Sequence, residues 1–385
     1  LGGCIVALLL LTLLLLLFPG LILGATSYAE RSSANQQVTV AFKPSDGDLF
    51  VALPGSIRPP DDDTPQSSFT VAWDADGFRL PAQPAATYPI AVFGDSFTEG
   101  FNVPTPYADG LAALLGVGVR NYGYRAYGPA EVAQAAEQVA GVEARQWVLY
   151  GYFSGNDLGD AVRPPKIDTR SPVAVWDALL TKLRPRATLQ PSVETPHYDF
   201  PMPVIIGGQY YELAFLWYYW WWQRVPTDAA FAESQNFAVV GNALDTIVAA
   251  SPGACRALIF IPTKEQLYYR YIYDTERRWV LENAHKLALE ATDNTLQLIP
   301  APLTPADDAV FAASLTGQRD AIAALVAQHP GWVLIDLTPT FEAAVGQGAL
   351  LYYPYDSHWN QAGHDLAVQT IAAWLRAAPS CTLAP

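Results

Sequence analysis

Two short polar motifs, near opposite ends of the chain, contain the residue types that catalyse acyl transfer. Gly94-Asp95-Ser96 follows an apolar run, and Asp356-Ser357-His358 lies close to the C-terminal end. A serine hydroxyl needs a base to attack a carbonyl, and histidine supplies one near neutral pH. A neighbouring aspartate can hold the imidazole in the tautomer that accepts the serine proton. We therefore predict Ser96 as nucleophile, His358 as base and Asp356 as the orienting carboxylate.

Two further motifs lie between them, Asn121 to Gly128 and Gly155-Asn156-Asp157. An asparagine amide can donate a hydrogen bond to a developing oxyanion. Each motif alone also fits an ordinary helix cap or turn, because Asp, Ser, Asn and Gly are common there. All four motifs come in order at the ends of successive predicted elements, which favours one shared site.

The elements that position these motifs alternate between apolar strands and helices. Strands are predicted over 90–93, 117–121, 147–153, 257–261 and 333–337, and helices over 106–115, 131–140, 276–292 and 361–377. Near-continuous apolar strands are typical of a parallel sheet covered on both faces. Active sites of such sheets lie at the carboxyl ends of the strands. The predicted class is therefore α/β with a central parallel sheet.

The chain divides into three predicted parts. A leucine-rich run long enough to span a bilayer precedes the first charged residue, Glu30, and predicts a transmembrane anchor or a signal segment. Two short strands around a Pro- and Asp-rich loop then predict a small β-rich appendage. The expected boundaries are 1–24 for the anchor or signal, 25–86 for the linker and appendage, and 87–385 for the catalytic domain, with an insertion at about 160–250.

Composition narrows the classes of partner. The net charge of −15 repels nucleic acid phosphates, so we predict no nucleic-acid binding. No Cys or His spacing resembles a zinc site, and no cofactor is expected. Cys255 and Cys381 are predicted either to pair in an oxidising compartment or to remain free thiols. The aromatic run 217–222 fits a core helix, a sugar-binding groove, a lid or a membrane interface.

The four motifs resemble those of the SGNH hydrolase superfamily, also called GDSL hydrolases, over about residues 88–375. The resemblance implies a flavodoxin-like three-layer sandwich, the SGNH hydrolase fold, with an acyl-serine mechanism. It implies that Ser96 is the nucleophile and donates its N–H to the oxyanion hole, with Asn156 as a second donor. His358 would be the base and Asp356 its orienting partner. The remaining donor falls on Ala126, where family members often have glycine, and Gly128 is the alternative.

Three segments resemble a membrane-anchored subgroup that is similar to the catalytic domain of alginate O-acetyltransferases: 76–79, 262–265 and 356–360. Lys264 in the second segment would touch substrate or form a surface ion pair. The resemblance implies an esterase that removes O-acetyl or similar acyl groups from carbohydrate. The alternatives are an O-acetyltransferase for a cell-surface polysaccharide and a non-catalytic carbohydrate-binding protein. Lipid esters are a further substrate option, and the oligomeric state stays open.

We expect the chain to be extracytoplasmic. It would be either anchored in the membrane by its N-terminal segment or secreted after cleavage of that segment. Its expected partners are an acylated carbohydrate, or another small ester, and the membrane.

Overall fold

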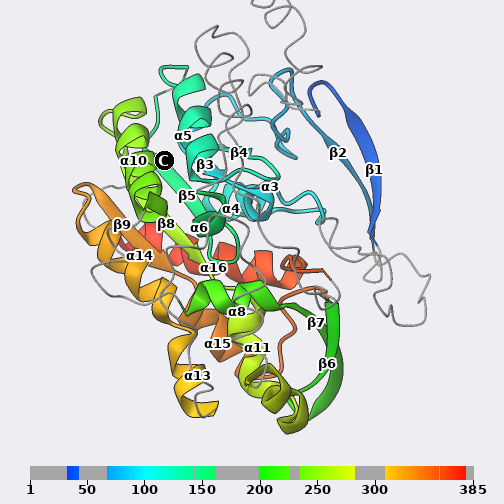
Figure 1. Ribbon diagram of the computed structural model, residues 1–385. Helices are drawn as coiled ribbons and strands as arrows, with labels where there is room; N and C mark the ends of the chain where they lie inside the picture. Colours follow the sequence, from blue (N-terminus) through cyan, green and yellow to red (C-terminus); the bar gives the residue numbers. More distant parts are fainter. Residues whose placement is uncertain are drawn as a thin grey trace, which may run out of the picture.

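A five-stranded parallel sheet forms the centre of the protein (Figure 1). The computed structural model describes residues 33–42, 67–142, 144–161, 199–224, 235–281, 308–354 and 356–378. The strands are β3 (Ile90–Gly94), β4 (Val119–Gly123), β5 (Trp147–Phe153), β8 (Cys255–Ile261) and β9 (Trp332–Asp336). They lie in the order β4-β3-β5-β8-β9. This arrangement confirms the predicted α/β class and its flavodoxin-like strand order.

Both faces of the sheet are buried, because neighbouring side chains along each strand point to opposite sides. Ile90 and Val92 of β3 enter one hydrophobic core, whereas Ala91 and Phe93 enter the other. All five residues of β3 are buried. The continuous apolar runs of the sequence are thus explained by cores on both sides.

Helices cover each face of the sheet and make the sandwich three-layered. One core receives side chains from α4 (Tyr107–Leu115), α15 (Thr338–Gly346) and α16 (Gln361–Ala377). The opposite core receives side chains from α5 (Pro129–Gln138), α10 (Gln235–Ala250) and α14 (Gly317–Ala327). Shorter helices are α3 (Ser96–Glu99), α6 (Asp157–Asp160), α11 (Lys264–Tyr268), the 3₁₀ turn η2 (Tyr269–Tyr271) and α13 (Asp308–Ser314).

The strand order reverses at β3, because the next strand in the chain, β4, lies on one side of β3 and the following strand, β5, lies on the other. The carboxyl ends of these three strands meet in register, with Gly94 opposite Gly123 and Gly151. Ligands of open α/β sheets bind outside this switch point. Ser96 and Asn156 follow β3 and β5, and the Asn121–Gly128 motif begins within β4 and continues beyond its end.

A small antiparallel pair of strands, called the N-terminal hairpin below, forms the β-rich appendage that the sequence predicts. It consists of β1 (Gln37–Phe42) and β2 (Ser67–Ala72), which pair in register from Gln37–Ala72 to Phe42–Ser67. A turn follows, in which Gly77 donates its N–H to Asp74 O at 3.0 Å. Valines of both strands pack with Trp73, Val103 and Tyr353, so the hairpin contacts the α/β sandwich through a core of its own.

The insertion between β5 and β8 contains a second hairpin that the sequence analysis did not predict. β6 (Asp199–Ile206) and β7 (Gln209–Leu216) pair antiparallel and lead directly into α8 (Trp217–Gln223). Tyr219, Trp220 and Trp222 of this helix are all buried in the two cores. These three members of the aromatic run are therefore core residues, as expected for a packed helix.

Two predictions concern segments outside the described residues. No helix in the described ranges is long and apolar enough to cross a membrane, and residues 1–24 lie outside those ranges. Cys255 is disulfide-bonded. Both other cysteines, Cys4 and Cys381, also lie outside the described residues, so the pairing with Cys381 stays a prediction.

The close packing at the switch point makes Gly94 a sensitive position. A Cβ atom there would lie 2.2 Å from Thr98 Oγ1 and 2.7 Å from the Gly151 carbonyl oxygen, so α3 and β5 would have to separate. We expect Gly94→Ala to lower the free energy of unfolding by about 3 kcal/mol in denaturant titrations. The matched control is Gly346→Ala, whose Cβ would meet only Tyr271 Oη at 3.5 Å. Equal stability of the two variants would contradict this packing.

Candidate active site

Ser96 is presented by a strand-to-helix turn at the end of β3. Asp95 is the N-cap of α3, and its Oδ1 accepts the Phe97 N–H at 2.9 Å. Ser96 is thereby the first residue of the helix, directly above the end of the strand. Within the described residues its N–H has no hydrogen-bond partner, as expected for the first residue of a helix. That N–H is available to a ligand beside the hydroxyl.

The structure brings Ser96, His358 and Asp356 together. Ser96 Oγ lies 2.8 Å from His358 Nε2, although the two residues are 262 positions apart. His358 Nδ1 lies 2.6 Å from Asp356 Oδ1, which also accepts the His358 backbone N–H at 2.9 Å. Because the carboxylate only accepts, Nδ1 carries the proton and Nε2 is left to accept from the serine hydroxyl. This is the geometry that a serine nucleophile requires.

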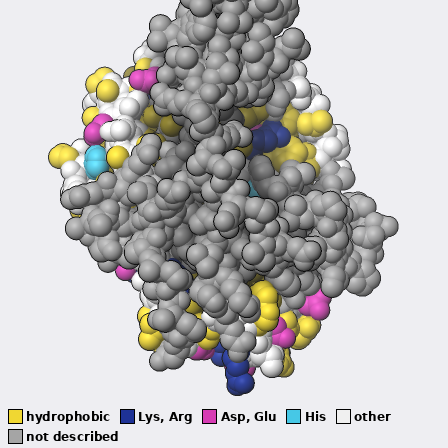
Figure 2. All heavy atoms as spheres, in the orientation of Figure 1, with side chains coloured by type: hydrophobic (Ala, Val, Ile, Leu, Met, Phe, Trp, Pro, Cys, Tyr) yellow, Lys and Arg dark blue, Asp and Glu magenta, His cyan; other side chains and the backbone are white. Residues whose placement is uncertain are grey.

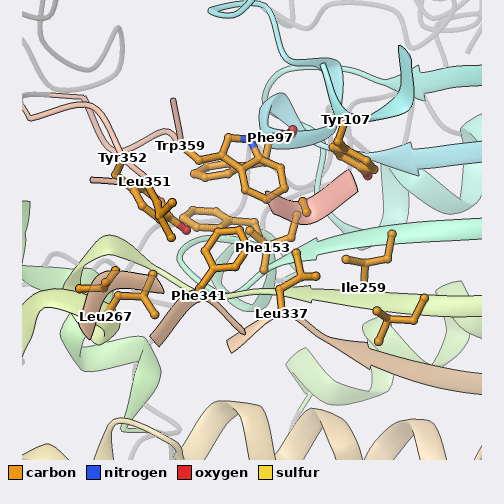
Figure 3. Close-up of a cluster of buried hydrophobic side chains, with 14 of the residues drawn as sticks. Phe97, Tyr107, Phe153, Ile259, Leu267, Leu337, Phe341, Leu351, Tyr352 and Trp359 are labelled. Carbon is orange, nitrogen blue, oxygen red and sulfur yellow. Dashed lines mark hydrogen bonds between the residues drawn. The ribbon is translucent and has the colours of Figure 1, made fainter. Parts of the chain in front are cut away.

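Aromatic side chains pack around Phe97, the residue that follows the nucleophile (Figure 3). The Phe97 ring lies 4.7 Å from the His358 ring and stacks on Phe153 at 3.5 Å. Trp359 donates its indole N–H to Phe97 O at 3.2 Å. Ser96 and His358 are only 8% and 7% exposed. Charge interactions at the site are therefore stronger than in water, and the imidazole has little freedom to rotate.

Ala126 and Gly128 are the two alternatives for the oxyanion donor in the Asn121–Gly128 motif. Of the two, Ala126 has a backbone N–H that is available. Gly128 already donates its N–H to Glu131 Oε2 at 3.1 Å. The Ala126 N–H has no partner among the described residues. Ala126 has φ of +60°, a left-handed conformation that residues with a Cβ atom rarely adopt. Such strain is frequent at functional sites.

Asn156 follows β5 and precedes α6. Its side chain lies near the Asp95 carboxyl and acts to lower the pKa of that group. Its Oδ1 is buried and has no partner in the described part of the chain. The amide therefore lies next to the N-cap of the nucleophile helix. Its donation to an oxyanion stays a prediction.

Asp95 is a fully buried carboxyl beside the nucleophile. Burial raises its pKa to about 7, although the Phe97 N–H, the charge of His358 and the Asn156 side chain all act to lower it. Burial also raises the pKa of Asp157 well above its usual value, and the charge of Asp95 adds to this effect. Near neutral pH both the protonated and the ionised forms of Asp95 are therefore populated.

Lys264 supports the loop that carries Asp356 and His358. Its side chain is buried, and Nζ donates to the carbonyl oxygens of Tyr353, Pro354 and Asp356 at 3.3, 3.2 and 2.9 Å. This position differs from both earlier expectations, a substrate contact and a surface ion pair. The lysine instead fixes the backbone on which the base is mounted.

Two other regions hold the same loop. Ala214 in β7 donates its N–H to Pro354 O at 2.8 Å, so the unpredicted hairpin supports the loop directly. Tyr353 N donates to His358 O at 3.1 Å, and Tyr353 Oη donates to Asn102 O at 2.9 Å. The loop that carries His358 is therefore held by contacts from the insertion, from the segment after β8 and from the segment after α3.

No candidate metal cluster is found in the described part of the chain. Among the described residues, no group of three or more His, Cys, Asp or Glu side chains could hold a metal ion. Where described residues are visible in Figure 2, the acidic side chains lie scattered around this face. The chemistry that the described side chains can perform is nucleophilic attack with general acid–base assistance.

Comparison with known proteins gives only distant likenesses. No family model matches the sequence, and no curated protein matches it. Among solved structures, a carbohydrate esterase family 2 enzyme with a carbohydrate-binding domain from Myceliophthora fergusii is 13% identical, with 81% of this chain and 70% of that chain covered and a TM-score of 0.36. Phospholipase A1 from Streptomyces albidoflavus is 13% identical, with 75% and 99% covered and a TM-score of 0.39.

An extracellular lipase from Streptomyces rimosus is 15% identical, with 74% of this chain and all of that chain covered and a TM-score of 0.38. TM-scores this low describe distant likenesses. The assignment of the site therefore rests on its own geometry.

The raised pKa of Asp95 predicts a pH-dependent contribution to stability. Its pKa is about 7 in the folded chain and 3.8 in the reference state, so the folded chain binds more protons between these values. The contribution of Asp95 to stability therefore falls as pH rises from about 4 to about 7. We expect the melting temperature of wild type, relative to Asp95→Asn, to be higher at pH 5 than at pH 8. A constant or opposite difference would contradict the raised pKa.

The three hydrogen bonds of Lys264 predict a catalytic effect of its removal. We expect Lys264→Met to lower kcat by about tenfold to a hundredfold, because the base is displaced. The matched control is Arg256→Met at the opposite end of β8, which also removes a cation bound to backbone carbonyls, those of Val248 and Ser251. Steady-state kinetics and melting temperatures should show both variants destabilised and only Lys264→Met slowed. Unchanged kcat in Lys264→Met would refute its positioning role.

Proposed function

We propose that this chain is a serine esterase that hydrolyses acyl esters through an acyl-enzyme on Ser96. The observation that carries the proposal is the continuous hydrogen-bonded series of Ser96 Oγ, His358 and Asp356, with separations of 2.8 and 2.6 Å. Two N–H groups, those of Ser96 and Ala126, have no hydrogen-bond partner among the described residues and lie at the ends of adjacent strands. This combination fits a nucleophile with an adjacent oxyanion hole.

Acylation follows from the positions of these groups. Ser96 Oγ forms a bond to the ester carbonyl carbon while its proton moves to His358 Nε2. The carbonyl electron pair moves to oxygen, and the N–H donors stabilise the resulting oxyanion. Asp356 stabilises the imidazolium without taking its proton. When the tetrahedral intermediate collapses, the carbon–oxygen bond to the alcohol breaks and His358 protonates the leaving oxygen.

Deacylation repeats these steps with another nucleophile. His358 takes a proton from water, the hydroxyl adds to the acyl carbon, and the bond to Ser96 Oγ breaks as the serine recovers its proton. The free acid then leaves. If a sugar hydroxyl takes the place of water, the same residues transfer the acyl group. Hydrolase and transferase therefore differ only in the acceptor that reaches the acyl-enzyme.

The substrate class that we propose is an acylated carbohydrate, with acetyl as the acyl group. It is supported by the resemblance of segments 76–79, 262–265 and 356–360 to the alginate O-acetyltransferase-like subgroup. Transfer to a cell-surface polysaccharide is the second candidate, favoured by that same resemblance. A binding protein without catalysis is disfavoured, because such a protein would not need the assembled triad.

We also propose an extracytoplasmic location. The apolar N-terminal segment supports export, either as an anchor or as a cleaved signal. The disulfide bond of Cys255 supports an oxidising compartment, because such bonds are rare in reducing ones.

Hydrolysis of p-nitrophenyl acetate tests the proposed function. We expect wild type to hydrolyse the ester and Ser96→Ala to lose at least about a thousandfold in kcat, because the nucleophile is absent. Ser251→Ala is the matched control. Ser251 is also a buried serine, and its hydroxyl donates to Ile247 O at 2.5 Å, beside the amino end of β8. Equal rates for wild type and Ser96→Ala would overturn the proposal.

An acceptor titration separates the two outcomes of acyl transfer. In the presence of an oligosaccharide, a hydrolase releases acetate at an unchanged rate. A transferase releases p-nitrophenol faster and forms acetylated sugar, which mass spectrometry detects. Both outcomes require Ser96, so neither can be mistaken for background hydrolysis.

A further inference from the structure

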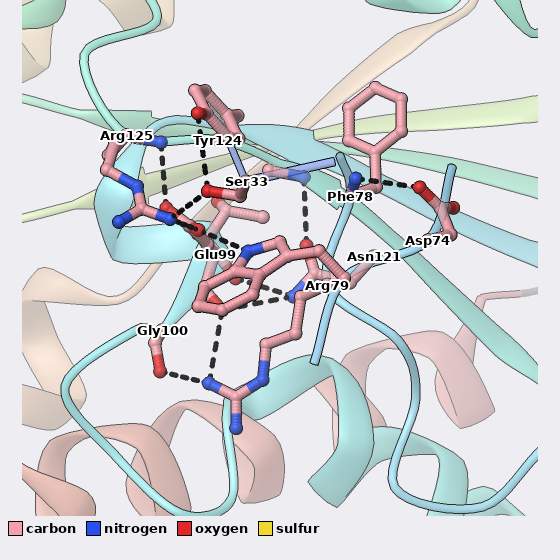
Figure 4. Close-up of polar contacts among 12 residues, drawn as sticks. Ser33, Asp74, Phe78, Arg79, Glu99, Gly100, Asn121, Tyr124 and Arg125 are labelled. Atoms are coloured by element: carbon pink, nitrogen blue, oxygen red, sulfur yellow. Dashed lines mark hydrogen bonds and ion pairs between the residues drawn. The ribbon is translucent and has the colours of Figure 1, made fainter. Parts of the chain in front are cut away.

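Glu99 links the helix that begins with the nucleophile to the Asn121–Gly128 segment, which carries the proposed oxyanion donor Ala126 (Figure 4). Its side chain is fully buried at the end of α3. Oε1 accepts the Trp73 indole N–H at 2.9 Å and the Arg125 guanidinium at 2.8 Å. Oε2 accepts the Arg125 backbone N–H at 2.9 Å. One carboxylate therefore fixes both the side chain and the backbone of Arg125.

Arg125 immediately precedes the strained residue Ala126. A residue with a Cβ atom keeps φ near +60° only where its surroundings determine the backbone. On one side, the Arg125 N–H is bound by Glu99. On the other, Tyr127 N donates to Tyr124 O at 3.2 Å and closes the turn. The direction of the Ala126 N–H thus depends on the hydrogen bonds of its neighbours.

The N-terminal hairpin supplies two of the groups that hold Arg125. Ser33, just before β1, accepts from Arg125 Nη2 at 2.7 Å. Trp73, just after β2, donates to Glu99, and the Arg125 guanidinium lies over its ring at 5.2 Å. Trp73 is only 3% exposed and packs with Val103 and Tyr353. The Trp73 side chain is therefore buried against these residues and is not accessible to a ligand.

We propose that the N-terminal hairpin is a positioning element of the active site. Through Trp73 and Ser33 it fixes Glu99 and Arg125, and these hold Ala126 in the left-handed conformation that keeps its N–H free as an oxyanion donor. The hairpin thus acts on the oxyanion donor through Glu99 and Arg125. This inference rests on the proposed esterase function.

Trp73→Phe is the most direct test, because it removes the indole N–H and keeps an aromatic ring in place. We expect kcat for p-nitrophenyl acetate to fall about tenfold, less than the hundredfold to thousandfold typical of complete loss of an oxyanion donor. KM should stay unchanged, because the oxyanion exists only in the transition state. An unchanged kcat in Trp73→Phe would overturn the inference.

A second substitution tests whether the effect passes through Ala126. Glycine adopts positive φ without the steric penalty of a Cβ atom. Ala126→Gly alone should change kcat by less than about twofold, and Trp73→Phe with Ala126→Gly should recover most of the lost rate. A simple loss of stability would not be rescued in this way. A double variant as slow as Trp73→Phe would also overturn the inference.

Asp74→Asn is the matched control, because it weakens the attachment of the hairpin without removing a contact to Glu99 or Arg125. Asp74 pairs with Arg120 of β4, a link between the hairpin and the catalytic domain that does not lead to Ala126. We expect a lower melting temperature with unchanged kcat. If Trp73→Phe does not fold, Ser33→Ala replaces it, with an expected fall in kcat of about threefold at constant KM. An unchanged kcat in Ser33→Ala would then count against the inference.

Failure of the inference and failure of the proposed function give different results. If wild type hydrolyses the ester no faster than Ser96→Ala, the proposed function fails, and with it the inference. If wild type is active and Trp73→Phe is equally fast, only the inference fails.

Discussion

The hydrogen bond between Ser96 and His358 is the contact that the rest of the structure maintains. It joins a serine at the end of one strand to a histidine 262 residues away, within a distance of 2.8 Å. The parallel sheet fixes the serine, because β3 is buried on both faces and α3 begins at its end. Among the described elements, no strand of the sheet leads directly into His358. Its position depends instead on Asp356 and on the buried ammonium of Lys264.

The two parts of the site are therefore held in different ways. Ser96 is held by the sheet, and the loop that carries His358 is held by hydrogen bonds. Three glycines in register bring α3 close to the sheet, which leaves little freedom around Ser96. The loop from 353 to 358 is held by hydrogen bonds from β7, from Lys264 and from its own backbone. The two hairpins, which lie outside the sandwich, contribute to this support. One contacts the loop, and the other contacts Glu99 and Arg125.

Much of this arrangement could be predicted from the sequence, because local patterns determine it. Strand β5 was predicted with the bounds that the structure shows, since its apolar run is continuous, and the Ser96 turn follows from a Gly-Asp-Ser sequence after a strand. Hairpin β6–β7 was not predicted, since its exposed strand residues and pairing give no strong local signal. The roles of Lys264 and Glu99 depend on partners 89 and 26 residues away, which no local pattern specifies.

Mapping a covalent adduct shows whether Ser96 is the nucleophile and whether His358 activates it. A fluorophosphonate reacts with an activated serine by forming a phosphorus–oxygen bond and releasing fluoride, and peptide mass spectrometry then identifies the labelled residue. We expect a single label on Ser96, which disappears in His358→Ala because the hydroxyl loses its base. A label on another serine, or labelling of Ser96 that does not depend on His358, would contradict it.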